Sequence, residues 1–277
     1  MQDPSRAASG DSAPVLCGII LHPAGHTLSP VLHQSAYAAL GLEASYAVFD
    51  VVPQELEAAI ASMRARGIRQ LSVSIPHKEA VLKLADRVSE DARRIGAANT
   101  LTRVGDLIVA DNTDWLGVLR TLETSGPWRG KRGCILGAGG AARGVVYALR
   151  KLEMEVRIVN RTRERAERLA HELDAEVGSL EQPYDLLVNA TPLGMHPDVD
   201  STPAPAELLR EGATVFDTVY RPPETRLLRE AAARGCRTQG GLDMLVHQAV
   251  EQIRIWSGQT PDPVLLRQTA LEALAES

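Results

Sequence analysis

The chain has 277 residues, of which 44% are hydrophobic and 23% are charged. This composition is that of an ordinary globular protein, which excludes disordered and collagen-like classes. Asp and Glu number 35 against 30 Lys and Arg, a formal net charge of −5, with no long basic run. The charge therefore does not favour nucleic acid or an anionic membrane as the main partner, so we expect a small molecule. At roughly 100 to 200 residues per domain, the length predicts two domains and excludes a single small disulfide-stapled module.

Cysteine, histidine and apolar residues are arranged in ways that limit the class further. The three cysteines, Cys17, Cys134 and Cys236, are far apart and form no C-x-x-C pair, so neither a disulfide framework nor a zinc site is indicated. The seven histidines form no helical pair backed by an acid, and we predict no metal. No stretch approaches the ~20 apolar residues that span a bilayer, and residues 1–14 lack the features of a secretory signal. We expect a cytoplasmic protein with a flexible tail at residues 1–14.

The first half of the chain alternates short apolar runs with helical periodicity, which predicts an α/β fold with a parallel sheet. Ser29 followed by Pro30 is typical of an N-cap with proline in the first turn, and Gly41 stands where a helix would end. The expected elements are strands at residues 15–21, 46–52 and 71–75, helices at 29–40 and 53–66, a helix beginning near Pro76, and extended runs at 99–104 and 107–111.

The second half contains a complete βαβ pattern. An apolar run at residues 133–136 leads into a glycine-rich loop and a helix to about residue 152, followed by a strand at 156–159 and a helix at 162–173. Strands at 185–190 and 214–218 would extend the same sheet. Residues 242–276 are helical in pattern and bring no strand, so we expect them to pack back on the first domain. We therefore predict one domain from residues 15–114 plus 242–277 and a second from residues 115–241.

The glycine-rich loop is the first candidate binding motif. Without side chains at Gly137 and Gly139, the backbone can turn tightly and approach a pyrophosphate at the positive end of the following helix. Ala142 occupies the third position of the motif, which tolerates alanine. A glycine turn between a strand and a helix also serves packing alone, and this alternative stays open.

The end of the next strand indicates which dinucleotide would bind. NAD-binding sites usually place Asp or Glu there to hold the ribose hydroxyl. This chain instead has Asn160, Arg161, Thr162 and Arg165, which can pair with or donate to a 2′-phosphate, so the pattern favours NADP over NAD. Arg163, by contrast, is better explained as part of a solvated helix face.

Polar residues at three points of the first domain form a second candidate site. Thr27 and Ser29 flank a helix start, where hydroxyls and backbone amides suit a carboxylate, although Ser29 could serve only as a cap. Lys78 is expected in the first turn of a helix, against the helix dipole, which suggests a benefit other than helix stability. Asp114 stands at the predicted domain junction, where a cleft should form. The alternative to a functional role for Asp114 is that it serves only as the N-cap of a helix.

These residues lie in stretches that resemble the shikimate dehydrogenase family over nearly the whole chain after the tail. Many ordered matches carry the resemblance. They are HTLSPVLH at residues 26–33, SIPHK at 74–78, GAANT at 96–100, NTD at 112–114, GAGGAAR at 137–143, NRT at 160–162, NATPLGM at 189–195, the stretch 217–225 around Tyr220, and GLDML at 241–245 leading to Gln248.

The resemblance implies NADP-linked interconversion of shikimate and 3-dehydroshikimate in aromatic amino-acid biosynthesis by an oxidoreductase acting on a CH–OH group. It implies that residues 15–114 plus 242–277 bind substrate, that residues 115–241 form a Rossmann-type NADP domain, and that Lys78 and Asp114 form the catalytic pair. We hypothesise that Asp114 mainly orients Lys78 and the reacting hydroxyl. The implied substrate-binding residues are Thr27, Ser29, Ser74, Asn99, Tyr220 and Gln248. The implied cofactor-binding residues are Gly137, Ala138, Gly139, Gly140, Ala141, Asn160, Arg161, Thr162, Arg165, Thr191, Met195 and Gly241.

Three departures from the family pattern leave alternatives open. Serine is usual where this chain has Thr27, and asparagine where it has Ser72, so a quinate/shikimate or aminoshikimate dehydrogenase with broader acid or NAD specificity is an alternative. Trp115 replaces the usual glycine and either narrows the cleft, stacks on the cofactor, or packs at the domain junction. A non-catalytic NADP-sensing regulator is an alternative of another class, and retention of Lys78 and Asp114 argues against it. We expect a monomer or a homodimer.

Overall fold

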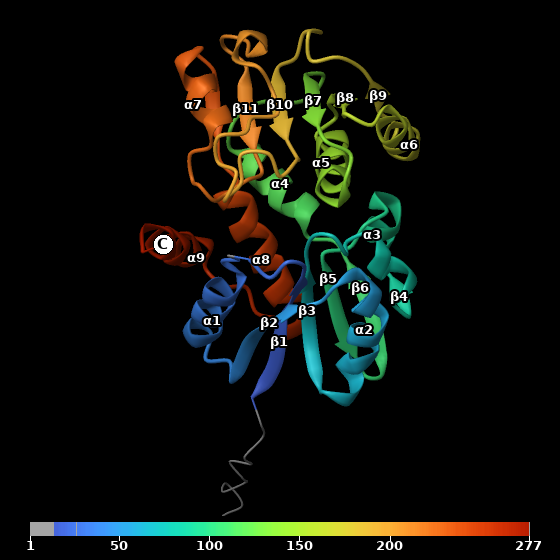
Figure 1. The fold of residues 1–277 in the computed structure, drawn as a ribbon. Coiled ribbons are helices and arrows are strands. Elements are labelled where there is room, and N and C mark those ends of the chain that lie inside the picture. The colour runs from blue at the N-terminus through green and yellow to red at the C-terminus, as the bar shows by residue number, and fades with distance from the viewer. Residues whose placement is uncertain (1–13, 26, 277) are drawn as a thin grey trace, which may run out of the picture.

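The computed structural model describes residues 14–25 and 27–276. The predicted tail therefore lies outside the described residues, apart from Pro14. Within the described part, two six-stranded sheets stand one above the other, each flanked by helices (Figure 1). The first sheet has the strand order β2-β1-β3-β5-β6-β4 and the second has the order β12-β11-β10-β7-β8-β9.

The chain builds the first sheet before it crosses to the second, and then returns. The first part comprises β1 Val15–Leu21, α1 Ser29–Ala39, β2 Ala44–Asp50, α2 Leu56–Ala65, β3 Ile68–Val73, β4 Arg87–Val88, α3 Glu90–Ile95, β5 Thr100–Val104 and β6 Leu107–Asp111. The second comprises α4 Asp114–Glu123, β7 Arg132–Leu136, α5 Gly140–Lys151, β8 Glu155–Val159, α6 Arg163–Leu173, β9 Glu176–Val177, β10 Leu186–Asn189, β11 Thr214–Asp217, α7 Arg226–Ala233 and β12 Arg237–Gln239. The last two helices are α8 Leu242–Ser257 and α9 Pro263–Ala275.

The first sheet is not wholly parallel, so the sequence expectation was wrong for one strand. Strand β1 pairs in parallel with β2 and β3, whereas β5 runs antiparallel to both β3 and β6. Only Gly105 and Asp106 separate β5 from β6, and Gly105 has φ +61°. A two-residue connection can join only antiparallel strands, because a parallel crossover needs a dozen or more residues.

Two expected helix starts also differ from the structure. Leu28 rather than Ser29 is the N-cap residue of α1, and no side chain caps that helix, whereas Gly41 does adopt the expected left-handed φ of +65°. The chain near Pro76 forms turns and then a short 3-10 helix, Ala80–Lys83. Lys78 therefore lies in a turn, and the argument from the helix dipole does not apply to it.

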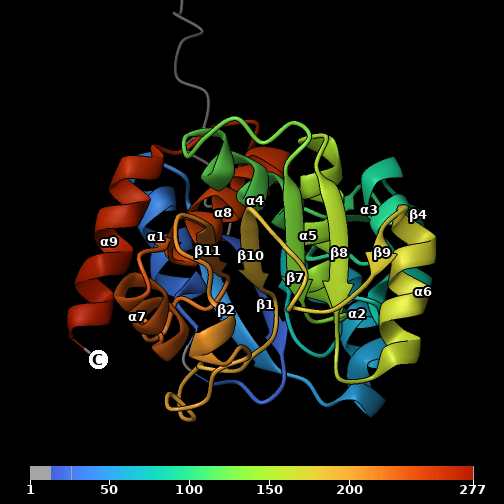
Figure 2. The same cartoon turned by 90° about the horizontal axis from the view of Figure 1, so that it is seen from above.

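The second sheet is parallel throughout and confirms the predicted βαβ unit, with β10, β7 and β8 adjacent. Seen from above, its strands lie side by side between α7 at one flank and α6 at the other (Figure 2). The helices α8 and α9 return to the first sheet and pack against α1, as expected. Their apolar residues, including Val250 and Ile253, share a buried cluster with Leu32 and Tyr37 of α1.

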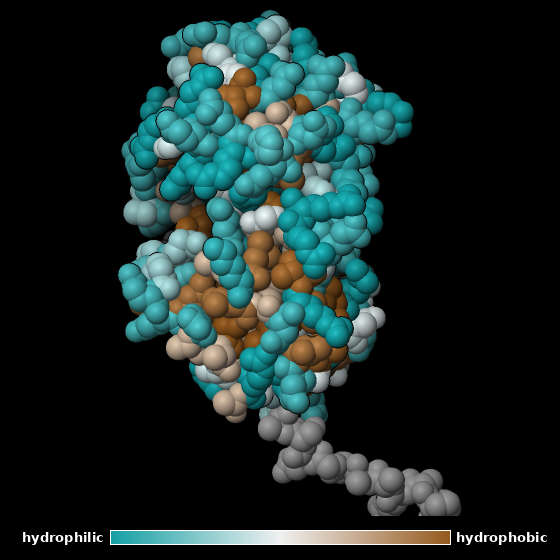
Figure 3. Space-filling model, turned by 90° about the vertical axis from the view of Figure 1, so that its right-hand side faces the viewer, coloured by the Kyte–Doolittle hydropathy of each residue, from teal (hydrophilic) through white to brown (hydrophobic). Residues whose placement is uncertain are grey.

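The surface on the side of α2 and α3 is mostly hydrophilic, with apolar side chains gathered in its lower half, over the first sheet (Figure 3). No helix in the described part of the chain is long and apolar enough to cross a membrane. The three cysteines carry free thiols.

Candidate active site

Lys78 and Asp114 meet at the junction of the two sheets. Lys78 Nζ lies 2.7 Å from Asp114 Oδ2, and the side chains are 15% and 5% exposed. The turn that carries Lys78 is fixed because its carbonyl accepts a hydrogen bond from the amide of Ala98, at 2.8 Å. Asp114 is the first residue of α4, after the N-cap Thr113. The pair is thus a charge-assisted contact, still partly open to solvent on the lysine side.

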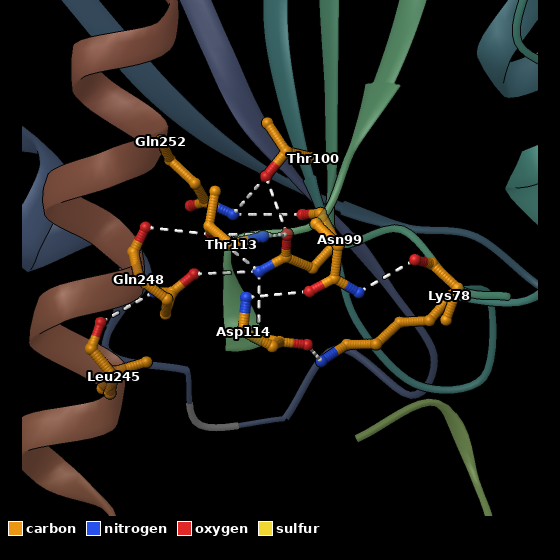
Figure 4. A network of polar contacts seen from close by, with 10 residues as sticks. Lys78, Asn99, Thr100, Thr113, Asp114, Leu245, Gln248 and Gln252 are labelled. Atoms are coloured by element: carbon orange, nitrogen blue, oxygen red, sulfur yellow. Dashed lines mark hydrogen bonds and ion pairs between the residues drawn. The ribbon is translucent and has the colours of Figure 1, made fainter. Parts of the chain in front are cut away.

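Asn99 links this pair to α8 (Figure 4). Its Nδ2 donates to Asp114 Oδ1 at 2.9 Å and to Gln248 Oε1 at 3.3 Å, while its Oδ1 accepts the Thr113 amide at 2.7 Å. Asn99 precedes β5, Asp114 begins α4, and Gln248 lies on α8. Four residues predicted for the site, far apart in sequence, are therefore brought into one hydrogen-bonded group.

Thr27, Ser29 and Tyr220 form a second polar group. Thr27 Oγ1 donates to Ser29 Oγ and accepts from the Ser29 amide, both at 3.2 Å. Burial raises the pKa of Tyr220, and hydrogen bonding to Thr27 and to the Leu28 backbone opposes that rise. The three hydroxyls predicted to hold a carboxylate therefore lie together.

Ser74 follows β3 and is half-buried. Its amide donates to Ile20 O and its carbonyl accepts from the His77 amide, both at 2.9 Å. The backbone of the strand-to-turn segment leading to Lys78 is therefore anchored at Ser74.

A cavity of about 600 Å³ lies between the glycine-rich loop and the turn that carries Lys78. Lys78 itself lines it. The predicted cofactor-binding residues that line it are Gly137, Ala138, Gly139, Gly140, Ala141, Asn160, Arg161, Arg165 and Thr191. Thr162, Met195 and Gly241 do not line it: Thr162 and Gly241 are the N-cap residues of α6 and α8, and Met195 is 42% exposed.

The glycine-rich loop has features of both alternatives given above, which are pyrophosphate binding and packing. Different glycines account for each. Gly137 has φ +116°, and a Cβ there would lie 3.0 Å from Ala190 O, so the tight turn requires glycine. A Cβ at Gly140 would lie 2.8 Å from Lys78 Cβ, so this glycine admits the lysine. A helix N-terminus opening on a cavity suits a pyrophosphate. The loop therefore fits a dinucleotide and also positions Lys78.

Arg161 and Arg165 present two guanidinium groups at the cavity. Both side chains are exposed, both line the cavity, and neither forms an ion pair within the described part of the chain. Arg163, in contrast, pairs with Glu167 on the solvated face of α6, at 2.7 Å, as expected. The two unpaired guanidinium groups are thus available to a bound phosphate.

One face of α5 packs on the first domain, which the sequence did not reveal. Arg143 is 7% exposed, and its Nη1 donates to Ile95 O at 3.0 Å across the junction. A Cβ at Gly144 would lie 3.2 Å from Asp114 Cβ, and Tyr147 Oη donates to Asp91 Oδ1 at 2.6 Å. Their spacing of three and four residues puts them on one helix face, and small residues at positions 140 and 144 were the available signal.

Trp115 packs at the domain junction. Its ring meets Tyr147 edge-on, with centroids 5.4 Å apart, and it does not line the cavity. Of the three roles considered for Trp115, the structure therefore agrees with packing at the domain junction. Ser72 is also internal: it is 5% exposed, accepts from Tyr46 Oη at 2.6 Å and donates to Gln252 Oε1 at 2.8 Å.

Two histidines near the site contact neighbouring residues of the first domain. His77 Nε2 lies 2.7 Å from Val51 O, and His22 Nδ1 lies 2.8 Å from Asp50 Oδ1. The described residues include no group of three or more His, Cys, Asp or Glu that could hold a metal ion.

Sequence profiles match most of the chain. The shikimate dehydrogenase substrate binding domain matches residues 19–101, the shikimate/quinate 5-dehydrogenase profile matches residues 121–191, and the shikimate 5′-dehydrogenase C-terminal domain matches residues 241–271. A protein named shikimate dehydrogenase (NADP(+)) from Thermococcus kodakarensis is 44% identical over 96% of this chain and 99% of its own.

Solved structures agree with these matches. Shikimate 5-dehydrogenase from Thermus thermophilus, in complex with NADP(H) and shikimate, has a TM-score of 0.89 and 41% identity over 94% of this chain and 100% of its own. Quinate dehydrogenase from Corynebacterium glutamicum, in complex with NAD, has a TM-score of 0.85 and 31% identity over 94% and 99% of the two chains. With the matched profiles and the 44% identity found along nearly the full length, the chain belongs to the shikimate dehydrogenase family.

Proposed function

We propose that the chain is an NADP-dependent oxidoreductase that interconverts shikimate and 3-dehydroshikimate in aromatic amino-acid biosynthesis. The observation that carries this function is the position of Lys78: it lines the cavity that fits the cofactor and contacts Asp114, 2.7 Å away, in the neighbouring polar group. A proton-transfer group therefore stands where substrate and nicotinamide would meet.

The residues of the pair would divide the chemistry. Bound NADPH would supply a hydride to the carbonyl carbon of 3-dehydroshikimate. As that carbon is reduced, its oxygen must gain a proton, which Lys78 Nζ would donate. In the reverse direction the lysine would take the proton from the hydroxyl. Asp114 holds the ammonium through Oδ2, while its Oδ1 is held by Asn99. Asp114 is thus proposed to orient Lys78 and the reacting hydroxyl.

Two polar groups would hold the substrate at opposite ends. Thr27 and Ser29, with Tyr220 beside them, offer hydroxyls to the carboxylate. Asn99 and Gln248, with Ser74, would hold the ring hydroxyls. We accordingly assign substrate binding to residues 15–114 plus 242–277 and NADP binding to residues 115–241. We further propose that the protein acts in the cytoplasm, since its cysteines are unpaired, and as a monomer or homodimer.

The alternative within the family is a quinate/shikimate or aminoshikimate dehydrogenase. Thr27 supports it through the extra methyl group beside the carboxylate position. Arg161 and Arg165 line the cavity and have no ion-pair partner among the described residues, which favours NADP over NAD. Initial rates of NADP and NAD reduction, each with shikimate and with quinate, separate the two: the proposal requires the highest kcat/KM for shikimate with NADP, and a preference for quinate or NAD contradicts it.

Lys78→Ala tests the catalytic assignment. We expect kcat to fall by about 10²- to 10⁴-fold, the usual contribution of a general acid or base, with little change in substrate KM. Lys83→Ala, in the adjacent 3-10 helix, is the matched control and should keep full turnover. A kcat of Lys78→Ala within tenfold of the parent value would contradict the assignment. If the parent binds NADP but turns over none of the acids, the sensor alternative would be supported.

A further inference from the structure

We propose that Gln252 is a positioning residue that holds the two ends of the substrate site in register. This proposal rests on the function proposed above. Gln252 lies on α8, one helical turn after Gln248, and is only 1% exposed. It does not line the cavity, so it would act through its neighbours rather than on substrate.

Every polar atom of the Gln252 side chain has a partner. Its Nε2 donates to Asn99 O and to Thr100 Oγ1, each at 3.0 Å, and its Oε1 accepts from Ser72 Oγ at 2.8 Å. A buried amide costs free energy unless it is satisfied, and here both ends are. The side chain is therefore held in one orientation, with its donor end toward Asn99 (Figure 4).

The donor end of Gln252 leads to the catalytic pair. Thr100 Oγ1, which accepts from Gln252, donates its single hydrogen to Asn99 Oδ1 at 2.9 Å. The Asn99 amide group then points its Nδ2 at Asp114 Oδ1, 2.9 Å away. Gln252 thus fixes both the main-chain carbonyl and, through Thr100, the side chain of the residue that holds the Asp114 carboxylate.

The acceptor end of Gln252 leads to the proposed carboxylate site. Ser72 accepts from Tyr46 Oη at 2.6 Å, and hydrogen bonding of Tyr46 with Ser72 and with Ser29 partly opposes the rise that burial causes in the pKa of Tyr46. A continuous chain of hydrogen bonds therefore runs from Tyr46 through Ser72 and Gln252 to Asn99 and Asp114, and its Tyr46 end lies beside Ser29. Because packed interiors tolerate little displacement, this chain sets the distance between carboxylate and reacting hydroxyl.

Gln252→Met removes the hydrogen bonds and nearly preserves the volume. We expect kcat to fall by tenfold to hundredfold and KM for shikimate to rise, because Asn99 and Asp114 lose contacts that hold them in place, while the Kd for NADP stays within twofold. Gln268→Met, which changes an exposed glutamine of α9, is the matched control and should match the parent. A general loss of structure would move the Kd for NADP as well, which would overturn the proposal, as would a kcat within twofold of the parent.

Two further variants separate positioning from a merely structural role. Thr100→Val removes the hydroxyl that links Gln252 to the side chain of Asn99, so the double variant with Gln252→Met should cost less than the product of the two single losses. Gln252→Glu keeps the acceptor for Ser72 and loses the donor when ionised. Its kcat relative to the parent should rise as the pH is lowered, because the protonated carboxyl can donate again. Additive losses, or a flat kcat ratio against pH, would overturn the proposal.

Proton NMR of the Asn99 side-chain amide tests the same inference without turnover. In the parent, slow exchange of these protons with solvent is expected, and Gln252→Met should accelerate it while Gln268→Met does not. If the parent reduced neither nicotinamide with any acid, the proposed function would fail, and the Asn99 exchange rate would still decide the positioning role. Unchanged Asn99 exchange in Gln252→Met would overturn it.

Discussion

The substrate side and the cofactor side of the site differ in how their polar groups are satisfied. On the substrate side, Asn99 and Gln252 are buried and hydrogen-bonded within the protein. On the cofactor side, Arg161 and Arg165 are exposed and, within the described residues, unpaired. In the proposed function, the substrate side is thus preorganised, whereas the cofactor side would complete its contacts only with a bound phosphate. Substitutions on the substrate side should lower both the free energy of unfolding and kcat. Substitutions of the two arginines on the cofactor side should mainly weaken NADP binding.

Buried hydrogen bonds hold the loop of Thr191 on the cofactor side. Asp217 is fully buried and accepts from Thr225 Oγ1 at 2.7 Å and from Asn189 Nδ2 at 2.9 Å. Asn189 Oδ1 in turn accepts from the amide and the hydroxyl of Thr191, at 2.9 and 2.7 Å. The loop that carries Thr191 is therefore preorganised, and the contrast between the sides concerns the arginines specifically.

Replacing both arginines tests the contrast most strongly. In the Arg161→Ala/Arg165→Ala variant, we expect kcat/KM for NADP to fall about hundredfold or more, because each charge-assisted contact contributes roughly 1.5–3 kcal/mol. The rate with NAD should change less than threefold, and the free energy of unfolding by less than about 0.5 kcal/mol. Steady-state rates with both cofactors and urea denaturation measure these quantities.

Arg163→Ala is the matched control, because this arginine is exposed but paired with Glu167. It should leave the preference for NADP unchanged. An equal loss of activity with NADP and NAD in the double variant would mean that the arginines do not read the 2′-phosphate.

Gly140 joins the two sides and should show an intermediate effect. In Gly140→Ala, the new Cβ would lie 2.8 Å from Lys78 Cβ, so the lysine must shift away from its position beside Asp114. We expect kcat to fall about tenfold, since small misplacements of a catalytic group are costly. Gly144→Ala brings a Cβ to 3.2 Å from Asp114 Cβ and should cost less. If kcat is unchanged in Gly140→Ala while the Kd for NADP rises, this glycine serves the phosphate alone.

The sequence predicted residues that recur in motifs and missed those whose role depends on packing. The glycine-rich loop and the polar residues Lys78, Asn99 and Asp114 stand next to strand ends or within short motifs, where local pattern indicates function. Gln252 carries no motif, because its partners Ser72 and Thr100 are some 150 or more positions away in the chain. The antiparallel β5 was missed because the period of two is the same in both strand directions.

The two regions also contain buried titratable groups that should respond oppositely to pH. Burial lowers the pKa of His33, stacked on Tyr46 at 4.2 Å, from 6.5 to about 3. Burial is also the main cause that raises the pKa of Asp217 from 3.8 to about 6. The unfolded chain therefore binds the His33 proton more readily than the folded chain does, and the reverse holds for Asp217.

Of the variants discussed, those at His33 and Asp217 should change turnover at neutral pH least. They should change the pH dependence of the free energy of unfolding with opposite signs in the two regions. The contribution of neutral His33 to stability is lost as pH falls from 6.5 toward 3, and that of protonated Asp217 is lost as pH rises from 3.8 to about 6. Each gives a slope of up to about 1.4 kcal/mol per pH unit. In urea denaturation across this range, His33→Leu should remove a rise of stability with pH, and Asp217→Asn should remove a fall. Changes in slope of the same sign in the two variants, each relative to the parent, would mean that burial does not set both pKa values. The contrast between the regions would then be limited to Arg161 and Arg165.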